Sequence, residues 1–239
     1  MKTEILHIGD IPAVLYGPAA ERVFLFVHGQ MGCKEEAGDF AAAAVPSGWQ
    51  VLGIDLPGHG ERAAEMDRFV PWEVVPELLT VMEWIRERWR TVALRCNSIG
   101  AWFSMLAFPE EPLDRCLFVS PVVDMSRLIE DMMGWAGVTP EQLEAAGEIE
   151  TAFGQTLSWA YRTWAGEHPV TRWEHPTAVL YGTADHMTAR PTVDDFVRRT
   201  GARLTVLDGG EHWFHTPEQL AVLRDWERTA LMAGDGNMV

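Results

Sequence analysis

The chain has 239 residues, of which 47% are hydrophobic, which is enough for the core of one α/β domain. Its formal net charge of −16 opposes binding to nucleic acids and to anionic membranes, because both recognise Lys and Arg. The three cysteines have no metal-ligand spacing, and the chain shows no signal peptide and no apolar run that could span a membrane, so we expect a cytoplasmic protein.

The predicted elements alternate between strand and helix along the chain. Residues 5–8 and 13–16 are strand-like and are separated by Gly9-Asp10, which predicts an antiparallel hairpin. Further strands are expected at residues 23–27, 51–54, 91–94, 117–119, 177–181 and 204–207, and helices at residues 35–45, 72–89, 101–108 and 217–232. This alternation predicts an α/β fold with a mostly parallel sheet and helices on both faces. The polar tail from Ala233 is expected to fray.

One region, residues 124–176, interrupts the alternation and divides the core into residues 1–123 and 177–239. It is rich in Trp and Met and looks helical, because a structureless loop of this length is uncommon in a compact domain. One interpretation is a helical cap over the functional site, with Trp135 and Trp159 lining an apolar pocket together with Met31. The other is a helical insertion that only packs on the core. Sequence order suggests that both ends of the region lie at the C-terminal edge of the sheet.

Ser98 stands at the turn between the predicted strand 91–94 and the predicted helix 101–108, with the small residues Cys96 and Gly100 on either side. This is the pattern of a nucleophile elbow, in which a tight strand-to-helix turn exposes a hydroxyl at the start of a helix. Cys96 occupies the position where the pattern usually has a first Gly. The alternative is that Ser98 merely caps a buried helix.

Ser98, Asp185 and His212 each follow a different predicted strand, and ligands bind at that edge of an open parallel sheet. A hydroxyl becomes a useful nucleophile when an imidazole takes its proton, and a carboxylate fixes the tautomer of that imidazole. The three residues therefore predict a catalytic triad. His215 is an alternative base and Asp124 an alternative acid.

Over nearly its whole length, the chain resembles the α/β-hydrolase superfamily. The resemblance rests on the segments VFLFVHGQMG, VLGIDLPGHGER, LRCNSIGA, LYGTADHM and LDGGEHWF, in the order of that superfamily. Within it, the chain is similar to small capped bacterial esterases and serine-aminopeptidase-like hydrolases. The resemblance implies that Ser98 is the nucleophile, His212 the general base and acid, and Asp185 the orienting carboxylate. It also implies an oxyanion hole formed by the backbone N–H groups of Gln30 and Ile99.

These implications lead us to expect a serine hydrolase that cleaves small to medium apolar carboxylic esters through an acyl-enzyme. Such an enzyme needs no cofactor or metal. Its partner would be a small-molecule ester, with no nucleic acid or membrane, and it would act as a monomer or homodimer. The same triad could instead cleave amides, thioesters or C–C bonds. A non-catalytic ligand-binding member of the fold is a further alternative, which the intact set of Ser, His and Asp argues against.

Overall fold

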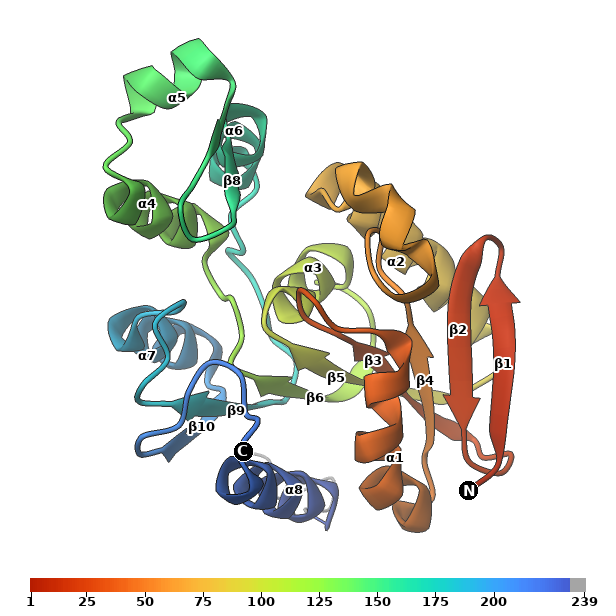
Figure 1. Ribbon diagram of the computed structural model, residues 1–239. Helices are drawn as coiled ribbons and strands as arrows, with labels where there is room; N and C mark the ends of the chain where they lie inside the picture. The colour runs from red at the N-terminus through yellow and green to blue at the C-terminus, as the bar shows by residue number, and fades with distance from the viewer. Residues whose placement is uncertain (233–239) are drawn as a thin grey trace.

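Within residues 1–232, which the computed structural model describes, eight strands form one sheet in the order β1-β2-β4-β3-β5-β6-β9-β10 (Figure 1). β1 pairs antiparallel with β2 and β2 antiparallel with β4, whereas all other neighbouring strands of this sheet are parallel. The sequence predicted this mostly parallel sheet with an antiparallel hairpin at its edge. The strands are β1 (Thr3–Ile8), β2 (Ile11–Tyr16), β3 (Arg22–Val27), β4 (Gln50–Ile54), β5 (Thr91–Asn97), β6 (Leu113–Val119), β9 (Thr177–Gly182) and β10 (Arg203–Leu207).

Two hydrophobic clusters, one on each face of the sheet, follow from the alternation of side chains along the strands. In β3, Val23, Leu25 and Val27 enter one cluster, whereas Phe24 and Phe26 enter the other. The first cluster is covered by α2 (Pro71–Arg86), α3 (Ile99–Ala107) and α7 (Arg190–Thr200), and the second by α1 (Ala37–Ala44) and α8 (Pro217–Met232). The predicted α/β architecture with helices on both faces is therefore confirmed. Across residues 1–232, no helix is long and apolar enough to cross a membrane.

Some elements differ from the sequence prediction for identifiable reasons. β5 continues to Asn97, beyond the predicted apolar run, because Arg95 is buried in the strand and its Nε pairs with Glu227 at 2.9 Å. α7 shows no clear apolar period in the sequence, because its exposed face is made of charged residues that pair with one another along the helix and its buried apolar positions are Val193 and Phe196. The predicted fraying from Ala233 onward lies outside the described residues.

The insertion contains three helices and a short hairpin, which together form a lobe set apart from the sheet (Figure 1). The helices are α4 (Met125–Ala136), α5 (Pro140–Ala146) and α6 (Trp159–Glu167), and β7 (Glu148–Glu150) pairs antiparallel with β8 (Thr156–Ser158). The helical content agrees with the expectation. The hairpin was not foreseen, because strands of three residues are too short to show a period.

The chain leaves the sheet at the C-terminal end of β6 and rejoins it at the opposite end, where β9 begins. β6 and β9 pair in parallel, with Cys116 opposite Thr177, so β9 begins at the edge where β6 also begins. The expectation that both ends of the insertion lie at the C-terminal edge is therefore wrong, because the segment 168–176 must return along the sheet. Trp173 holds this return segment: its ring lies 5.8 Å from that of Phe118, and its Nε1–H donates to Thr177 Oγ1 at 2.8 Å.

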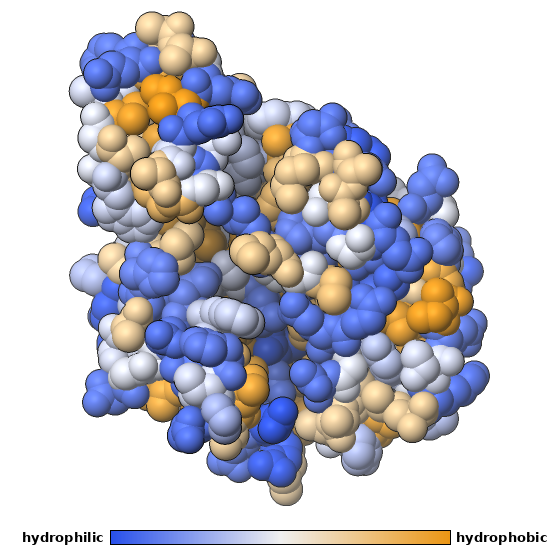
Figure 2. All heavy atoms as spheres, in the orientation of Figure 1, coloured by the Kyte–Doolittle hydropathy of each residue, from blue (hydrophilic) through white to orange (hydrophobic). Residues whose placement is uncertain are grey.

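Aromatic side chains join the lobe to the core. Trp102 of α3 stacks on Tyr161 of α6 with ring centroids 5.9 Å apart, and it meets Trp164 edge-on at 6.0 Å. Trp72, at the start of α2, lies 6.2 Å from the Tyr161 ring. Figure 2 shows the surface hollowed where the lobe meets the core. Aromatic pairs of this kind contribute about 0.5–1.5 kcal/mol beyond their burial, so this cluster helps to hold the lobe on the core.

The Tyr161 hydroxyl is buried within this cluster and has no hydrogen-bond partner among residues 1–232, and burial raises its pKa. Because an unsatisfied buried hydroxyl costs about 1–3 kcal/mol, we expect Tyr161→Phe to raise the free energy of unfolding. Urea denaturation measures this change. The matched control is Tyr181→Phe, which removes a buried hydroxyl that donates to Thr188 C=O at 3.0 Å and should lower the stability by about 1 kcal/mol. A loss of stability in both variants would contradict the conclusion that the Tyr161 hydroxyl is buried without a hydrogen-bond partner.

Candidate active site

The turn at Ser98 is strained and is held from the neighbouring strand. Ser98 has φ +48° and ψ −121°, a region that residues other than Gly seldom occupy. Its N–H donates to Val119 C=O at 3.0 Å, and its C=O accepts from the N–H of Val122 at 3.1 Å. Both partners come from the end of β6 and the residues after it, so the strained backbone is fixed on both sides of Ser98.

The Ser98 side chain is directed at an imidazole and not at the helix. Ser98 occupies the N-cap position of α3, but its side chain makes no capping hydrogen bond. Its Oγ instead lies 2.8 Å from His212 Nε2. The helix-cap interpretation of this serine therefore does not describe what its hydroxyl does.

The two small residues around the elbow have different roles. A Cβ on Gly100 would lie 2.5 Å from the carbonyl oxygen of His28 and 2.6 Å from that of Val27, so only Gly fits there. Cys96 is fully buried, with its Sγ 3.4 Å from Ser104 Oγ, and burial raises the pKa of its thiol to about 12. The core thus accommodates a small neutral side chain at the first elbow position, where the usual pattern has Gly.

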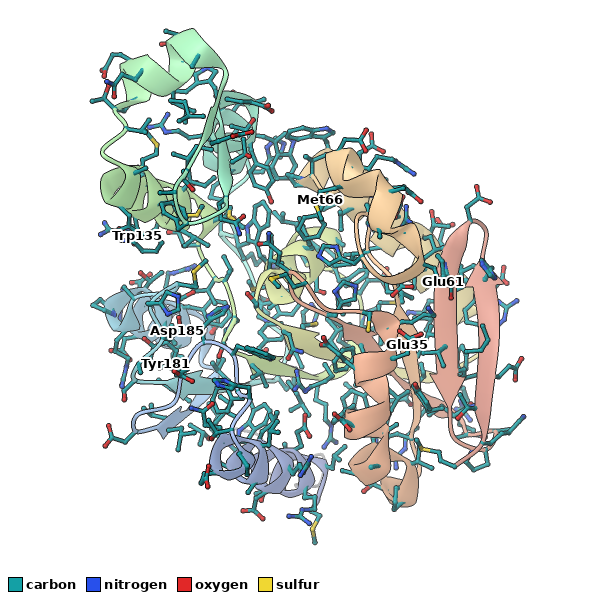
Figure 3. The ribbon with its side chains drawn as sticks, in the orientation of Figure 1. Glu35, Glu61, Met66, Trp135, Tyr181 and Asp185 are labelled. Atoms are coloured by element: carbon teal, nitrogen blue, oxygen red, sulfur yellow. The ribbon has the colours of Figure 1, made fainter. Side chains whose placement is uncertain are left out.

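Asp185 and His212 complete a line of hydrogen bonds that ends at Ser98. His212 Nδ1 lies 2.8 Å from Asp185 Oδ2, and the Asp185 side chain is fully buried (its place after β9 is labelled in Figure 3). The other carboxylate oxygen, Oδ1, accepts from the N–H groups of Met187 at 2.8 Å and Thr188 at 3.0 Å. Each oxygen of the carboxylate therefore has its own partners, which leaves the group little freedom to rotate.

This arrangement determines the proton positions. A carboxylate only accepts hydrogen bonds, so His212 Nδ1 carries a proton and Nε2 presents its lone pair to the Ser98 hydroxyl. Such an imidazole can take the proton of Ser98 as the oxygen attacks. The alternative residues are engaged elsewhere. Asp124 caps α4 by accepting from Arg127 N–H at 3.0 Å, and His215 Nδ1 lies 2.8 Å from Trp213 C=O.

The turn at residues 29–32 lies against the elbow. A Cβ on Gly29 would be only 3.1 Å from Ser98 Cβ, so the backbone that leads into Gln30 passes beside the hydroxyl-bearing residue. The turn is closed by Gly32 N–H, which donates to Gly29 C=O at 3.1 Å. Ile99 is the first residue of α3, where a backbone N–H has no partner within the helix. Ile99 thus adjoins Ser98 in the chain and Gln30 follows the glycine that packs on it, and their role as oxyanion donors stays a prediction.

His28 ties this turn to the loop after β4. Its Nδ1–H donates to Gly29 C=O at 2.7 Å, and its Nε2 accepts from Leu56 N–H at 3.1 Å. Burial lowers the pKa of His28 to about 4, so the ring is neutral near pH 7, as these two bonds require.

A buried lysine fixes the same two loops. Asp55 accepts from Lys34 N–H at 2.8 Å and from Lys34 Nζ at 2.9 Å, and its Oδ2 also accepts from Glu61 N–H at 3.0 Å. Lys34 Nζ additionally contacts Glu35 at 3.0 Å and Glu61 at 2.7 Å (both glutamates are labelled in Figure 3). Burial opposes the charge on Lys34, but these carboxylates raise its pKa. The sequence gives no signal for Lys34, because it is a single lysine outside any motif.

The predicted pocket residues are not gathered like the triad. Met31 is 92% exposed, and Trp135 is 50% exposed and meets Phe153 edge-on at 5.9 Å. Trp159 is partly buried, with the Arg162 guanidinium 5.1 Å from its ring centroid. Among the ring contacts of residues 1–232, none joins these three side chains to one another. Their role in binding substrate stays a prediction.

Two hollows of about 350 and 400 Å³ lie where the lobe joins the core. The larger is lined by residues 123–126 and 168–171, which we call the two stalks of the lobe, and also by Asp195 and Arg199 of α7. Neither hollow includes Ser98, Asp185 or His212, so both lie beside the lobe junction and not at the triad. In the described part of the chain, no cluster of three His, Cys, Asp or Glu side chains could hold a metal ion.

Comparison with known proteins shows which fold the chain shares. Neither a protein-family model nor a curated protein matches the sequence. Among solved structures, Est1E from Butyrivibrio proteoclasticus with bound ferulic acid has a TM-score of 0.76 at 17% identity, with 96% of this chain and 98% of that chain covered. The chain has the α/β-hydrolase fold.

Two further α/β-hydrolase structures span almost the whole chain. Alpha/beta hydrolase domain-containing protein 10 from mouse has a TM-score of 0.73 at 14% identity and covers 97% of this chain and 98% of its own. Monoacylglycerol lipase from Paleococcus ferrophilus has a TM-score of 0.66 at 16% identity, with coverage of 93% and 98%. At these identities the likeness establishes the fold, which the sequence motifs predicted.

The contact between Gly100 and the end of β3 can be tested directly. We expect Gly100→Ala to lower the free energy of unfolding by about 1–3 kcal/mol, because its Cβ must displace backbone carbonyls. Gly134→Ala in α4 is the matched control: a Cβ there has no neighbour within 4 Å, so the change should raise helix stability by up to about 1 kcal/mol. Equal stability of Gly100→Ala and the parent in urea denaturation would contradict the close approach of α3 to β3.

Proposed function

We propose that the protein is a serine hydrolase that cleaves carboxylic esters through an acyl-enzyme. The observation that carries the proposal is the continuous line of two 2.8 Å hydrogen bonds from Asp185 Oδ2 through His212 to Ser98 Oγ. The shared fold with esterases and a lipase supports a hydrolase, since in this fold the nucleophile, acid and base follow strands in this order.

The first half of the reaction forms the acyl-enzyme. Ser98 Oγ attacks the ester carbonyl carbon, while its proton passes to His212 Nε2. The carbonyl oxygen becomes an oxyanion, which the N–H groups of Gln30 and Ile99 stabilise. When the C–O bond to the alcohol breaks, His212 returns the proton to the leaving oxygen and the acyl group remains on Ser98.

Water completes the cycle. It attacks the acyl carbon, gives one proton to His212 and forms a second oxyanion in the same place. As the bond to Ser98 Oγ breaks, His212 returns that proton to the serine and the carboxylic acid is released. Asp185 stays ionised throughout, and its bonds to Met187 and Thr188 keep it aligned with the imidazole.

The substrate class that fits best is a small to medium apolar ester. Tyr161 and Trp164 pack on the buried Trp102 of α3, the helix that follows Ser98. Trp72 contacts both of these lobe residues and stays 40% exposed at this junction, and exposed aromatic surface of this kind binds apolar acyl or alcohol groups. The net charge of −16 favours uncharged substrates over anionic ones. The solved neighbours include a ferulic acid complex and a monoacylglycerol lipase, and both names are consistent with ester chemistry.

Removal of the nucleophile tests the proposal. We expect Ser98→Ala to lower kcat/KM for p-nitrophenyl butyrate by roughly 10⁴-fold or more and to abolish covalent labelling by a fluorophosphonate probe. Ser126→Ala in α4 is the control and should keep both the ester turnover and the labelling by the probe. Parallel assays with a thioester, an anilide and a vinylogous diketone show whether esters are the preferred substrates. Undiminished ester turnover by Ser98→Ala would overturn the proposal.

The acid can be tested by exchanging one carboxylate at a time. In Asp185→Asn, the N–H groups of Met187 and Thr188 hold the amide oxygen, so the NH₂ group faces His212 Nδ1. His212 must then carry its proton on Nε2, where it cannot accept from Ser98, and we expect turnover to fall by roughly 10⁴-fold. Asp124→Asn should leave turnover within about twofold, because Asn also caps a helix well. Steady-state kinetics that rank the two variants in the opposite order would move the acid to Asp124.

A further inference from the structure

A solvent-exposed hydrogen bond between two side chains joins the lobe to the predicted oxyanion turn. Gln30 Nε2 donates to Oε1 of Gln155, at 3.1 Å, although the two residues are 125 positions apart in sequence. Gln155 lies at the end of the β7–β8 hairpin, whereas Gln30 supplies one of the two proposed oxyanion donors. The contact therefore connects the lobe to the part of the core where charge develops during the reaction.

The lobe side of this contact is rigid. Thr151 N–H donates to Gln155 C=O at 3.0 Å, and Thr151 Oγ1 donates to the same carbonyl at 2.6 Å. Gln155 N–H in turn lies 3.2 Å from Thr151 Oγ1. The hairpin end is thus closed across its base, so the Gln155 side chain extends from a fixed backbone.

The core side of the contact is strained. Met31 follows Gln30 and has φ +66°, at the turn position where Gly is the usual residue. Because Met31 is 92% exposed, its side chain makes few contacts that could offset this strain. Strained backbone persists only where the surroundings fix it. His28 and Gly32 hold the carbonyl of Gly29, on one side of Gln30, and Gln155 holds the Gln30 side chain.

We propose that Gln155 is a positioning residue that keeps the Gln30 N–H aimed at the oxyanion, so the lobe takes part in catalysis through the turn at residues 29–32. This inference rests on the proposed function. Its physical basis is that an oxyanion donor lowers the barrier only when its direction is set before charge develops. A turn that is free to rotate at Gln30 would lose that advantage.

The chemistry of the pair allows a sharp test. A glutamine amide can donate or accept, whereas an ionised glutamate only accepts. Gln155→Glu and Gln30→Glu should therefore each keep one donor and one acceptor. The double variant, Gln30→Glu with Gln155→Glu, places two carboxylates opposite each other. Gln155→Ala removes the hydrogen-bond partner of the Gln30 side chain. At about pH 8, we expect Gln155→Ala and the double variant to lose roughly 3- to 10-fold in kcat, with KM within about twofold and both single Glu variants close to the parent.

A transition-state mimic separates positioning from mere folding. An aryl boronic acid forms a tetrahedral adduct with a serine nucleophile. Its inhibition constant should therefore rise in Gln155→Ala by the same factor by which kcat falls. Glu144→Ala, at an exposed position on α5 in the same lobe, is the control and should change neither value.

The outcomes distinguish this inference from the function on which it rests. If the parent enzyme hydrolyses esters but Gln155→Ala matches Glu144→Ala in kcat and in boronate affinity, the positioning role is wrong. A rise in KM with unchanged kcat would also overturn it, because Gln155 would then act in substrate binding. A parent protein that neither hydrolyses esters nor reacts with the fluorophosphonate would instead overturn the proposed function.

Discussion

The close approach of α3 to the end of β3 is the constraint on which the site depends. At Gly100 the helix touches the carbonyls of Val27 and His28, so no side chain can stand between them. This contact brings Ser98 beside Gly29, and hence the hydroxyl beside the turn that carries Gln30. The chain must reverse direction within one residue to achieve it, which explains the unusual φ of Ser98. One turn further along α3, Trp102 reaches the aromatic residues of the lobe.

Much of the fold and of the site could be inferred from sequence, because both depend on local signals. Buried parallel strands appear as apolar runs. Ser98 follows β5 directly, and Asp185 and His212 lie in the loops after β9 and β10. What could not be inferred depends on partners far apart in the chain. Arg95 interrupts an apolar run, and the carboxylate that balances its buried charge is Glu227, 132 residues away. Lys34 and Gln155 belong to no motif, and the return of the chain before β9 follows from strand pairing that no short window shows.

Charge in this protein is organised into a few buried pairs beneath a strongly acidic surface. Lys34 with Asp55, Arg62 with Glu77 and Arg95 with Glu227 bring ions into the interior at 2.6–2.9 Å. Buried ion pairs contribute little net stability relative to apolar packing, but removal of one partner is costly, at about 3–5 kcal/mol. Their effect is to allow one arrangement of the segments they join. Two of the pairs fix the loops after β3 and β4.

The two stalks have a consequence for how this architecture can diversify. Residues 123–126 and 168–171 line one hollow of about 400 Å³, so the chain enters and leaves the lobe at neighbouring points. β9 is held in register by its pairing with β6 and β10. A lobe of another length can therefore join the same two stalks, provided that it still covers the apolar side chains of the core, such as Trp102, on which α6 now packs. A replacement that keeps the chemistry at full speed needs an acceptor in the place of the Gln155 amide.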